Sequence, residues 1–261
     1  MRTFAIVNRK GGVGKTATAV NLAYILATSC KKRVLLIDAD SQANASSIVT
    51  TPNEAGLTAV IQGDEPHYEN LIDHTDIPNL DLLPATEELA DLDLQCMAGL
   101  KQPAFFALRN FLEVLAEDDV YDLVVIDCPP YFSLSCVNAI MAADRIIIPT
   151  DTDGFSTGGM GKLVKQIDSI RKACPDVVIS GCLVTRWKKS DVAEDAINYL
   201  RDESPIHIFQ HVIRASDDKV RESTWAGQAV AQWSPWSNAS RDYRAWVAEL
   251  LEQEAISHEG V

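Results

Sequence analysis

The sequence contains no apolar run that approaches the roughly 20 residues a membrane-spanning helix needs. Its N-terminal stretch, MRTFAIVNRK, holds only a short apolar run without a cleavage-site pattern, so it predicts a first strand rather than a signal peptide. Cysteine is sparse, with six residues in 261 and no CxxC pair. This scarcity argues against a disulfide framework or a zinc site and predicts reduced, mostly buried thiols in a cytoplasmic protein.

Basic residues are also few, since the chain has 23 Lys and Arg but 37 Asp and Glu, which gives a net charge of −14. This balance argues against a globally basic nucleic-acid-binding protein. The charges are nevertheless segregated. Residues 1–37 carry bases and no acid, residues 38–119 are strongly acidic, and residues 162–189 are mainly basic. Such a distribution allows a basic face on an acidic protein.

Strand-length apolar runs alternate with helical patterns along the chain. The runs are TFAIVN, RVLLIDAD, YDLVVIDCPP, DRIIIPTD and DVVISGCLVT. Continuous apolar runs of this length predict strands buried on both faces of a parallel sheet. Helical patterns lie between them, the first over about residues 15–28. We therefore expect an α/β fold with a doubly wound, mostly parallel sheet and helices on both faces.

The chain is expected to form a single domain over residues 1–261, because no Pro/Gly-rich linker, repeat or low-complexity tract divides it. A terminal helix is predicted over about residues 238–256, with Trp246, Leu250 and Leu251 on one apolar stripe. The tail at residues 257–261 is expected to fray.

A glycine-rich stretch, NRKGGVGKTATAV at residues 8–20, follows the first predicted strand and opens the first predicted helix. A loop in this position cradles phosphate oxygens with its backbone N–H groups, at the positive end of the helix dipole. Lys15 is expected to pair with the β- and γ-phosphates, and the Thr16 hydroxyl to complete Mg²⁺ coordination. The motif residues are Gly11, Gly12, Val13, Gly14, Lys15 and Thr16.

Carboxylates end two of the predicted strands. Asp38 and Asp40 close RVLLIDAD, two residues apart and so on one side of an extended chain, and Asp127 closes YDLVVID. Ligands of open α/β sheets bind beyond the carboxyl ends of the strands, beside the phosphate loop. Asp127 therefore fits a Walker B metal ligand, and capping of the next turn is the alternative for any one of the three.

The extra Lys10 in KGGVGKT, followed by LLIDADSQAN and DLVVIDCPP, resembles the deviant Walker A ATPases of the ParA/MinD group. The resemblance extends to LLPATEELADLDLQ, to ADRIIIPTDTDGFSTGG and to VIRASDDKVRESTWAGQAVAQWSPWSNASRDYRAW, and so covers nearly the whole chain. In the last stretch the family pattern has a strand ending in Ile, here Ile213, before a charged helix. No helix-turn-helix segment precedes the loop, so the sequence is similar to the short ParA form.

The resemblance implies a Mg²⁺-dependent ATPase that sandwiches ATP between two copies of the chain and turns over slowly without a partner. It implies that Lys10 reaches across the dimer to the partner's phosphates and that Asp40 positions the attacking water. A second cation there stabilises charge on the transferred group, as an arginine finger does. Asp38 would help to organise Mg²⁺. The further nucleotide contacts implied are Lys10 and Ala17, with Thr185 and Arg186 as candidates for adenine.

Three departures from the family pattern affect the same region. Ala17 stands where a second threonine is common, which should matter little because Thr16 is the expected magnesium ligand. Ser41 replaces the usual proline after Asp40, so the loop there is expected to be looser. PPYFS replaces PPSLG, which leaves open its contact with a partner protein or the neighbouring subunit. None of the three removes a catalytic group.

The surface on which such a dimer acts is a separate question. Residues 241–261 hold two bases, Arg241 and Arg244, against five acids, so MinD-like membrane binding is disfavoured by the sign of the charge. The ParA resemblance implies nonspecific DNA binding on the nucleoid and a centromere-binding-type partner protein that stimulates hydrolysis. The candidate DNA contacts are Lys188, Lys189, Arg214, Lys219 and Arg221, with a solvated helix face as the alternative.

Two other functions share the same ATPase residues. One is the positioning of a non-DNA cargo, such as a protein compartment. The other is an iron–sulfur reductase that bridges a cluster between subunits, for which each copy must supply two thiolates. Cys128 follows Asp127, and Cys96 or Cys136 would be the second ligand, while buried structural cysteine is the alternative.

Overall fold

The computed structural model describes residues 1–50, 56–63, 67–151, 157–204 and 206–256. Its strands are β1 (Arg2–Ile6), β2 (Val34–Asp38), β3 (Asp73–His74), β4 (Leu80–Leu83), β5 (Leu123–Asp127), β6 (Arg145–Thr150) and β7 (Val178–Val184). Its helices are α1 (Lys15–Thr28), α2 (Asn44–Val49), α3 (Leu57–Gln62), α4 (Glu88–Met97), α5 (Ala107–Glu117), α6 (Leu134–Ala142), α7 (Thr157–Arg171), α8 (Asp191–Glu203), α9 (Asp217–Trp225), α10 (Val230–Trp233) and α11 (Asn238–Gln253), with a short 3₁₀ turn at Tyr68–Asn70.

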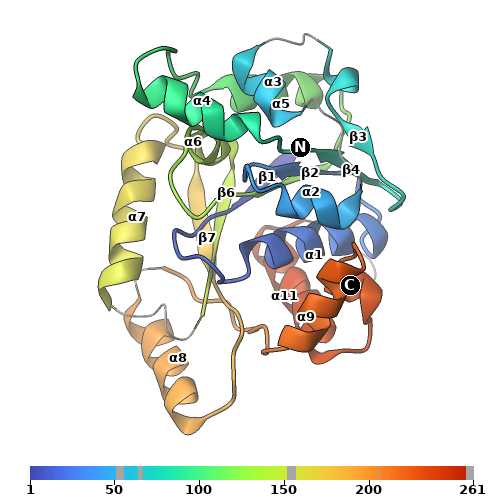
Figure 1. Cartoon of the computed structure of the whole chain (residues 1–261). Coiled ribbons are helices and arrows are strands. Elements are labelled where there is room, and N and C mark those ends of the chain that lie inside the picture. The colour runs from blue at the N-terminus through green and yellow to red at the C-terminus, as the bar shows by residue number, and fades with distance from the viewer. Residues whose placement is uncertain (51–55, 64–66, 152–156, 205, 257–261) are drawn as a thin grey trace.

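A seven-stranded sheet forms the centre of the molecule, in the order β3-β4-β2-β5-β1-β6-β7 (Figure 1). All neighbouring strands are parallel except β3, a two-residue edge strand that runs antiparallel to β4. Parallel neighbours require crossover connections, and helices supply them on both faces of the sheet. The predicted doubly wound, mostly parallel α/β fold is therefore confirmed.

The strands are buried on both faces, as their continuous apolar runs predict. Phe4 and Ile6 of β1 pack into a core with α1 and α11, whereas Ala5 between them packs on the opposite side with α5 and α6. This alternation follows from the two-residue period of a strand. Asp38 and Asp127 lie in register at the ends of β2 and β5, so their side chains lie on the same face of the sheet.

The C-terminal helix begins at the predicted residue and ends earlier than predicted, because α11 spans Asn238–Gln253. Its predicted stripe of Trp246, Leu250 and Leu251 is fully buried in the core shared with α1. The apolar face of α11 is thus occupied within the chain itself. No helix in the described part of the chain is long and apolar enough to cross a membrane. The predicted frayed tail at residues 257–261 lies outside the described residues.

The prediction of a strand ending at Ile213 is wrong. This segment forms only two isolated bridges, one between Ile208 and Cys182 of β7 and one between Arg214 and Trp187. Between those bridges the backbone N–H groups of residues 210 and 211 donate to the carboxylate of Glu249 on α11, at 2.6 and 2.9 Å. Backbone N–H groups that bond to a side chain cannot also bond to a neighbouring strand, so the strand does not continue here.

Candidate nucleotide site

The phosphate loop leaves β1 and is anchored at its entry by Asn8. The Asn8 side-chain amide donates to the carbonyl of Pro149 at 2.7 Å, and its side-chain oxygen accepts from the Lys10 N–H at 3.0 Å. Asn8 is 7% exposed, so these bonds replace lost hydration. The sequence pattern did not single out Asn8, because its partner Pro149 lies far along the chain on β6.

Two glycines give the loop its shape. Gly12 and Gly14 have φ of +77° and +79°, a left-handed conformation that glycine adopts without strain. Gly14 also precedes α1 and no side chain caps that helix end. The first N–H groups of α1 are therefore available to an anion at the positive end of the helix dipole.

A cavity of about 450 Å³ opens over the loop. It brings together Lys15 and Thr16 from α1 with Asp40 from the segment after β2, as predicted from the strand-end positions. The remaining lining residues are Gly11, Gly12, Gly14, Ala17, Ser41, Gln42, Asn44, Pro130 and Tyr131. Gln42, Asn44, Pro130 and Tyr131 were not predicted, since nothing in their local sequence shows that the loops after β2 and β5 meet here.

Lys15 is only 8% exposed, and its ammonium donates to the carbonyl of Lys10 at 3.2 Å. Burial lowers its pKa, and the negative charge of nearby Asp127 opposes that effect. A cation held in partial burial with one neutral acceptor has unused donors. It is suited to pair with phosphate oxygens in the cavity that it lines.

Asp38 and Asp127 lie side by side at the ends of β2 and β5 and are both buried. Asp38 accepts hydrogen bonds from the Asp40 N–H and from the N–H and hydroxyl of Ser46, at 3.1, 2.8 and 2.9 Å. Burial nevertheless raises the pKa of Asp38 to about 6. Burial, followed by the charge of Asp38, raises the pKa of Asp127 well above its usual value. A pair of adjacent buried carboxylates is thus poised to receive positive charge.

Asp127 has an unmet requirement that a cation would satisfy. No hydrogen bond of normal geometry reaches either of its carboxylate oxygens among the described residues, and the neighbouring Thr16 hydroxyl only partly offsets the effect of burial on its pKa. An orphaned buried carboxylate of this kind fits a divalent cation or the water that it carries. The described residues contain no group of three or more His, Cys, Asp or Glu arranged around a metal. Thr16, Asp38 and Asp127 would therefore need phosphate oxygens to complete a Mg²⁺ site, as phosphate loops do.

Replacing Asp127 tests this account of the buried pair. In EDTA and without nucleotide at pH 8, Asp127→Asn is expected to raise the unfolding free energy by about 1–3 kcal/mol, because an amide removes an unpaired buried charge. Since the pKa of Asp127 is raised in the folded state, wild-type stability is lost as the pH rises through that value. The increase in unfolding free energy of Asp127→Asn over the wild type should therefore become smaller at lower pH. Denaturant titrations of both proteins at several pH values measure it, and a destabilising substitution at pH 8 would refute it.

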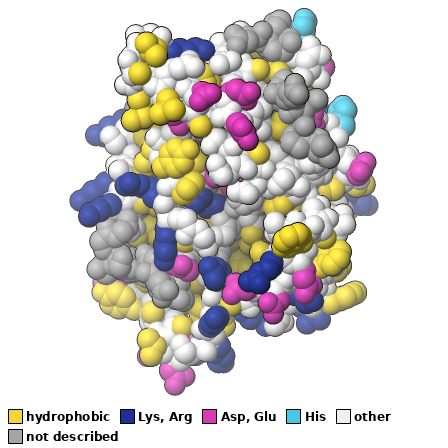
Figure 2. Space-filling model, viewed as in Figure 1, with side chains coloured by type: hydrophobic (Ala, Val, Ile, Leu, Met, Phe, Trp, Pro, Cys, Tyr) yellow, Lys and Arg dark blue, Asp and Glu magenta, His cyan; other side chains and the backbone are white. Residues whose placement is uncertain are grey.

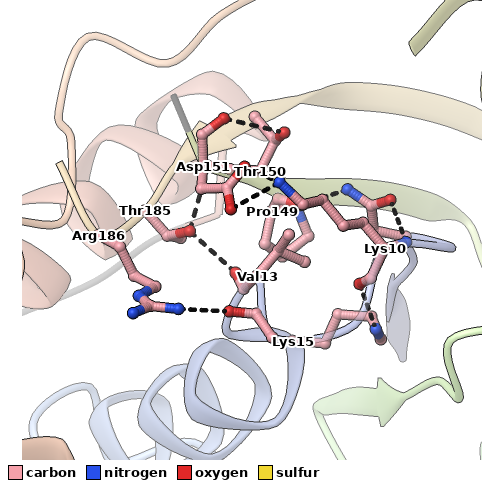
Figure 3. Close-up of polar contacts among 10 residues, drawn as sticks. Lys10, Val13, Lys15, Pro149, Thr150, Asp151, Thr185 and Arg186 are labelled. Carbon is pink, nitrogen blue, oxygen red and sulfur yellow. Dashed lines mark hydrogen bonds and ion pairs between the residues drawn. The ribbon is translucent and has the colours of Figure 1, made fainter. Parts of the chain in front are cut away.

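Lys10 takes a different direction from Lys15 (Figure 3). Its ammonium pairs with both carboxylate oxygens of Asp151, at 2.7 and 2.9 Å, and its side chain is 44% exposed. Lys10 does not belong to the cavity lining. The second lysine of the loop is therefore held at the surface by a residue that follows β6, and no sequence pattern pointed to Asp151. The predicted segment after Asp151, residues 152–156, lies outside the described residues.

Thr185 and Arg186 support the back of the phosphate loop. The Thr185 hydroxyl donates to the carbonyl of Val13 at 2.8 Å, with the carbonyl of Thr150 3.1 Å away (Figure 3). The Arg186 guanidinium donates to the carbonyl of Gly12 at 3.3 Å. Both side chains thus orient loop carbonyls away from the cavity. Their suggested contact with adenine stays a prediction.

The five basic DNA candidates are dispersed over the loop after β7, the segment before α9, and α9 itself. Three of them are paired with acids: Lys189 with Glu194 at 3.4 Å, Arg214 with Asp242 at 2.6 Å, and Lys219 with Glu222 at 2.8 Å. Within the described residues, Lys188 and Arg221 have no ion-pair partner. The paired bases offer less free charge than the sequence alone indicated.

Two of the three cysteines considered for an iron–sulfur cluster, Cys128 and Cys136, are buried. Cys128 and Cys136 are each 1% exposed, and the neighbouring Cys136 thiol and then burial raise the pKa of Cys128. Cluster ligands are thiolates, and a shared cluster needs them at a surface that meets the partner. These two thiols are buried rather than at such a surface, whereas Cys96 on α4 is partly exposed.

Comparison with known proteins identifies the family. The AAA domain family matches residues 1–179. The chromosome partitioning protein ParA of Caulobacter vibrioides is 32% identical over 259 residues, covering 97% of this chain and 95% of that protein. The chain belongs to the ParA-type ATPase family. The chromosome-partitioning ATPase Soj of Thermus thermophilus is 34% identical over 253 residues, with 96% of each chain covered.

A solved structure shares the fold of this chain. Cobyrinic acid a,c-diamide synthase from Mycobacterium smegmatis, crystallised with ADP and magnesium, aligns with a TM-score of 0.80 and 25% identity over 98% of this chain and 96% of its own. In this chain the cavity above the phosphate loop is lined by Lys15, Thr16 and Asp40.

Proposed function

We infer that this ParA-type ATPase binds ATP with Mg²⁺, dimerises around it, and as a dimer binds DNA nonspecifically to position a DNA cargo. The observation that best supports this function is that the two lysines of the loop lie in different places. Lys15 lines the nucleotide cavity, whereas the ammonium of Lys10 lies 2.7 Å from Asp151 at the surface. A loop cation turned outward can exchange its partner Asp151 for a nucleotide held by another copy of the chain. Hydrolysis then depends on dimerisation.

The remaining groups have separate roles. Lys15 and the free N–H groups at the start of α1 would bind phosphates. Thr16, Asp38 and Asp127 would hold Mg²⁺, which would supply positive charge beside those phosphates. Asp40 lines the cavity and accepts from the Gln42 N–H at 3.1 Å, which fixes the carboxylate to orient a water for attack. A centromere-binding-type partner protein would accelerate hydrolysis and so release the dimer from DNA.

DNA binding is supported by the family's partitioning relatives and by the two bases without an ion pair, Lys188 and Arg221. Phosphate contacts alone suffice for nonspecific affinity, and dimerisation doubles their number. The acidic surroundings make the expected binding weak and strongly dependent on salt. Such a switch would be cytoplasmic and nucleoid-associated when ATP is bound.

Co-sedimentation with duplex DNA tests this proposal. We expect retention with ATP and Mg²⁺ but not with ADP or without nucleotide, and a drop of at least about tenfold in affinity when salt rises from 50 to 200 mM. The double substitution Lys188→Glu and Arg221→Glu should abolish retention. The double substitution Lys31→Glu and Lys172→Glu, which makes the same charge change at exposed sites just after α1 and α7, should not. Retention indifferent to nucleotide and salt would contradict the proposal and favour a different cargo.

A further inference from the structure

An exposed apolar groove lies beside the nucleotide cavity. It has a volume of about 560 Å³ and runs between α4, the segment around Phe105 and the loop before α6. We call it the α4 groove and define it by Ala90, Leu94, Met97, Phe105, Tyr131 and Phe132. Leu94 and Met97 are 64% and 86% exposed. In Figure 2 hydrophobic side chains gather in the upper left, over α4 and its adjoining loops. Contiguous exposed apolar surface of this kind marks an interaction site.

Helix α4 carries apolar side chains on two faces. Leu89 and Leu92 are buried in the protein's own core. Leu94 and Met97, three residues apart and so adjacent on the helix, point instead into the groove. Covering one such side chain stabilises by about 1.5–3 kcal/mol, and the folded monomer leaves this gain unused.

The groove is connected to the nucleotide cavity by the loop that follows Asp127. Tyr131 in this loop lines both the cavity and the groove, and Pro130 lines the cavity. Asp93 of α4 accepts from the Leu134 N–H at 2.6 Å, which fastens the helix to the end of the same loop. A nucleotide that orders this loop therefore also shapes the groove.

The two borders of the groove carry opposite charge. Glu87, Glu88 and Asp91 are exposed at the start of α4, and residues 86–100 contain no Lys or Arg. Acidic side chains are visible beside the apolar patch in Figure 2. On the other border the exposed Arg9 of the phosphate loop lies 5.9 Å from the ring centre of Phe132. A two-fold rotation through such a groove brings acidic border to basic border and apolar centre to apolar centre.

We propose that a second copy of this chain docks on the α4 groove, so that the groove extends the dimer contact beyond the nucleotides. This proposal rests on the proposed ATP-dependent dimer and names the surface that stabilises it. Charge favours a second copy over DNA or anionic lipid, because the acidic border repels both. Continuity with the face that carries Lys10 and the nucleotide cavity favours it over an unrelated partner, since Tyr131 belongs to both surfaces.

Sedimentation equilibrium with a non-hydrolysable ATP analogue and Mg²⁺ tests the proposal. Leu94→Glu and Met97→Glu each place a charge at the centre of the groove without disturbing the buried core, and each should raise the dimer dissociation constant at least about tenfold. Val192→Glu is the matched control, because Val192 is 79% exposed on α8, away from the groove. It should dimerise like the wild type. Titration with a fluorescent ATP analogue at protein concentrations low enough to keep the wild type monomeric should show unchanged nucleotide affinity in all variants, which separates docking from folding.

The outcomes distinguish this proposal from the function on which it rests. A wild-type chain that stays monomeric with the analogue would refute the ATP-dependent dimer itself. A wild type that dimerises while Leu94→Glu and Met97→Glu dimerise equally well would leave that function standing and overturn docking at the groove. The groove would then be assigned to another partner protein.

Discussion

Replacing Lys10 with Ala is expected to lower the rate of ATP hydrolysis by about 10³-fold or more while leaving ATP affinity unchanged. The physical reason is the position of its ammonium, which pairs with Asp151 and lies outside the cavity lining. Lys10 thus contributes little to its own nucleotide and supplies charge stabilisation to the partner's. Phosphate release under single-turnover conditions and titration with a fluorescent ATP analogue measure the two quantities.

Two further variants separate the roles of the lysines. Lys15→Ala should lose ATP affinity, because Lys15 lines the cavity. Asp151→Asn removes the charge that holds Lys10 within its own chain but keeps the lysine, so hydrolysis should persist. If Lys10→Ala hydrolyses ATP like the wild type, or weakens ATP binding as strongly as Lys15→Ala, the assignment of Lys10 to the partner's nucleotide is wrong.

Replacing Asp40 with Ala is expected to slow hydrolysis by about 10²–10⁴-fold and to trap the ATP-bound dimer. Asp40 is 8% exposed, lines the cavity and is oriented by the Gln42 N–H at 3.1 Å. Removing the carboxylate leaves the phosphate contacts intact, so ATP and the partner copy should remain bound. Rapid-quench measurement of hydrolysis, combined with the mass of the complex in solution, tests both parts.

Asp40→Asn provides the matched control for geometry. The amide retains an oxygen that can accept from the Gln42 N–H but loses the charge that draws a proton from water. It should therefore behave like Asp40→Ala. Hydrolysis at the wild-type rate in either variant, or loss of the dimer in Asp40→Ala, would contradict the role of this residue.

The phosphate loop and the strand-end carboxylates were predictable from sequence because they depend on local order. A glycine loop between a strand and a helix has one arrangement, and the ends of parallel strands meet at one edge of the sheet. Asp40, Lys15 and Thr16 accordingly line one cavity. The start of α11 at Asn238 followed in the same way from its apolar period.

The contacts that tune the site were not predictable, since they join segments far apart in the chain. Asn8 bonds to Pro149 and Lys10 to Asp151, both beyond the reach of any local pattern. The same limit explains the DNA candidates. Arg214 appears as a free base in the sequence, yet the structure pairs it with Asp242 on α11. The same limit explains why no strand forms before Ile213, since the N–H groups of residues 210 and 211 donate to Glu249 on α11.

The mass of the wild-type chain in solution tests the central claim most directly. Light scattering coupled to size-exclusion chromatography should be performed with ATP and Mg²⁺, with ADP and Mg²⁺, and without nucleotide. We expect a dimer with ATP and Mg²⁺ and a monomer in the other two conditions. A monomer in all three conditions, or a dimer regardless of nucleotide, would contradict it.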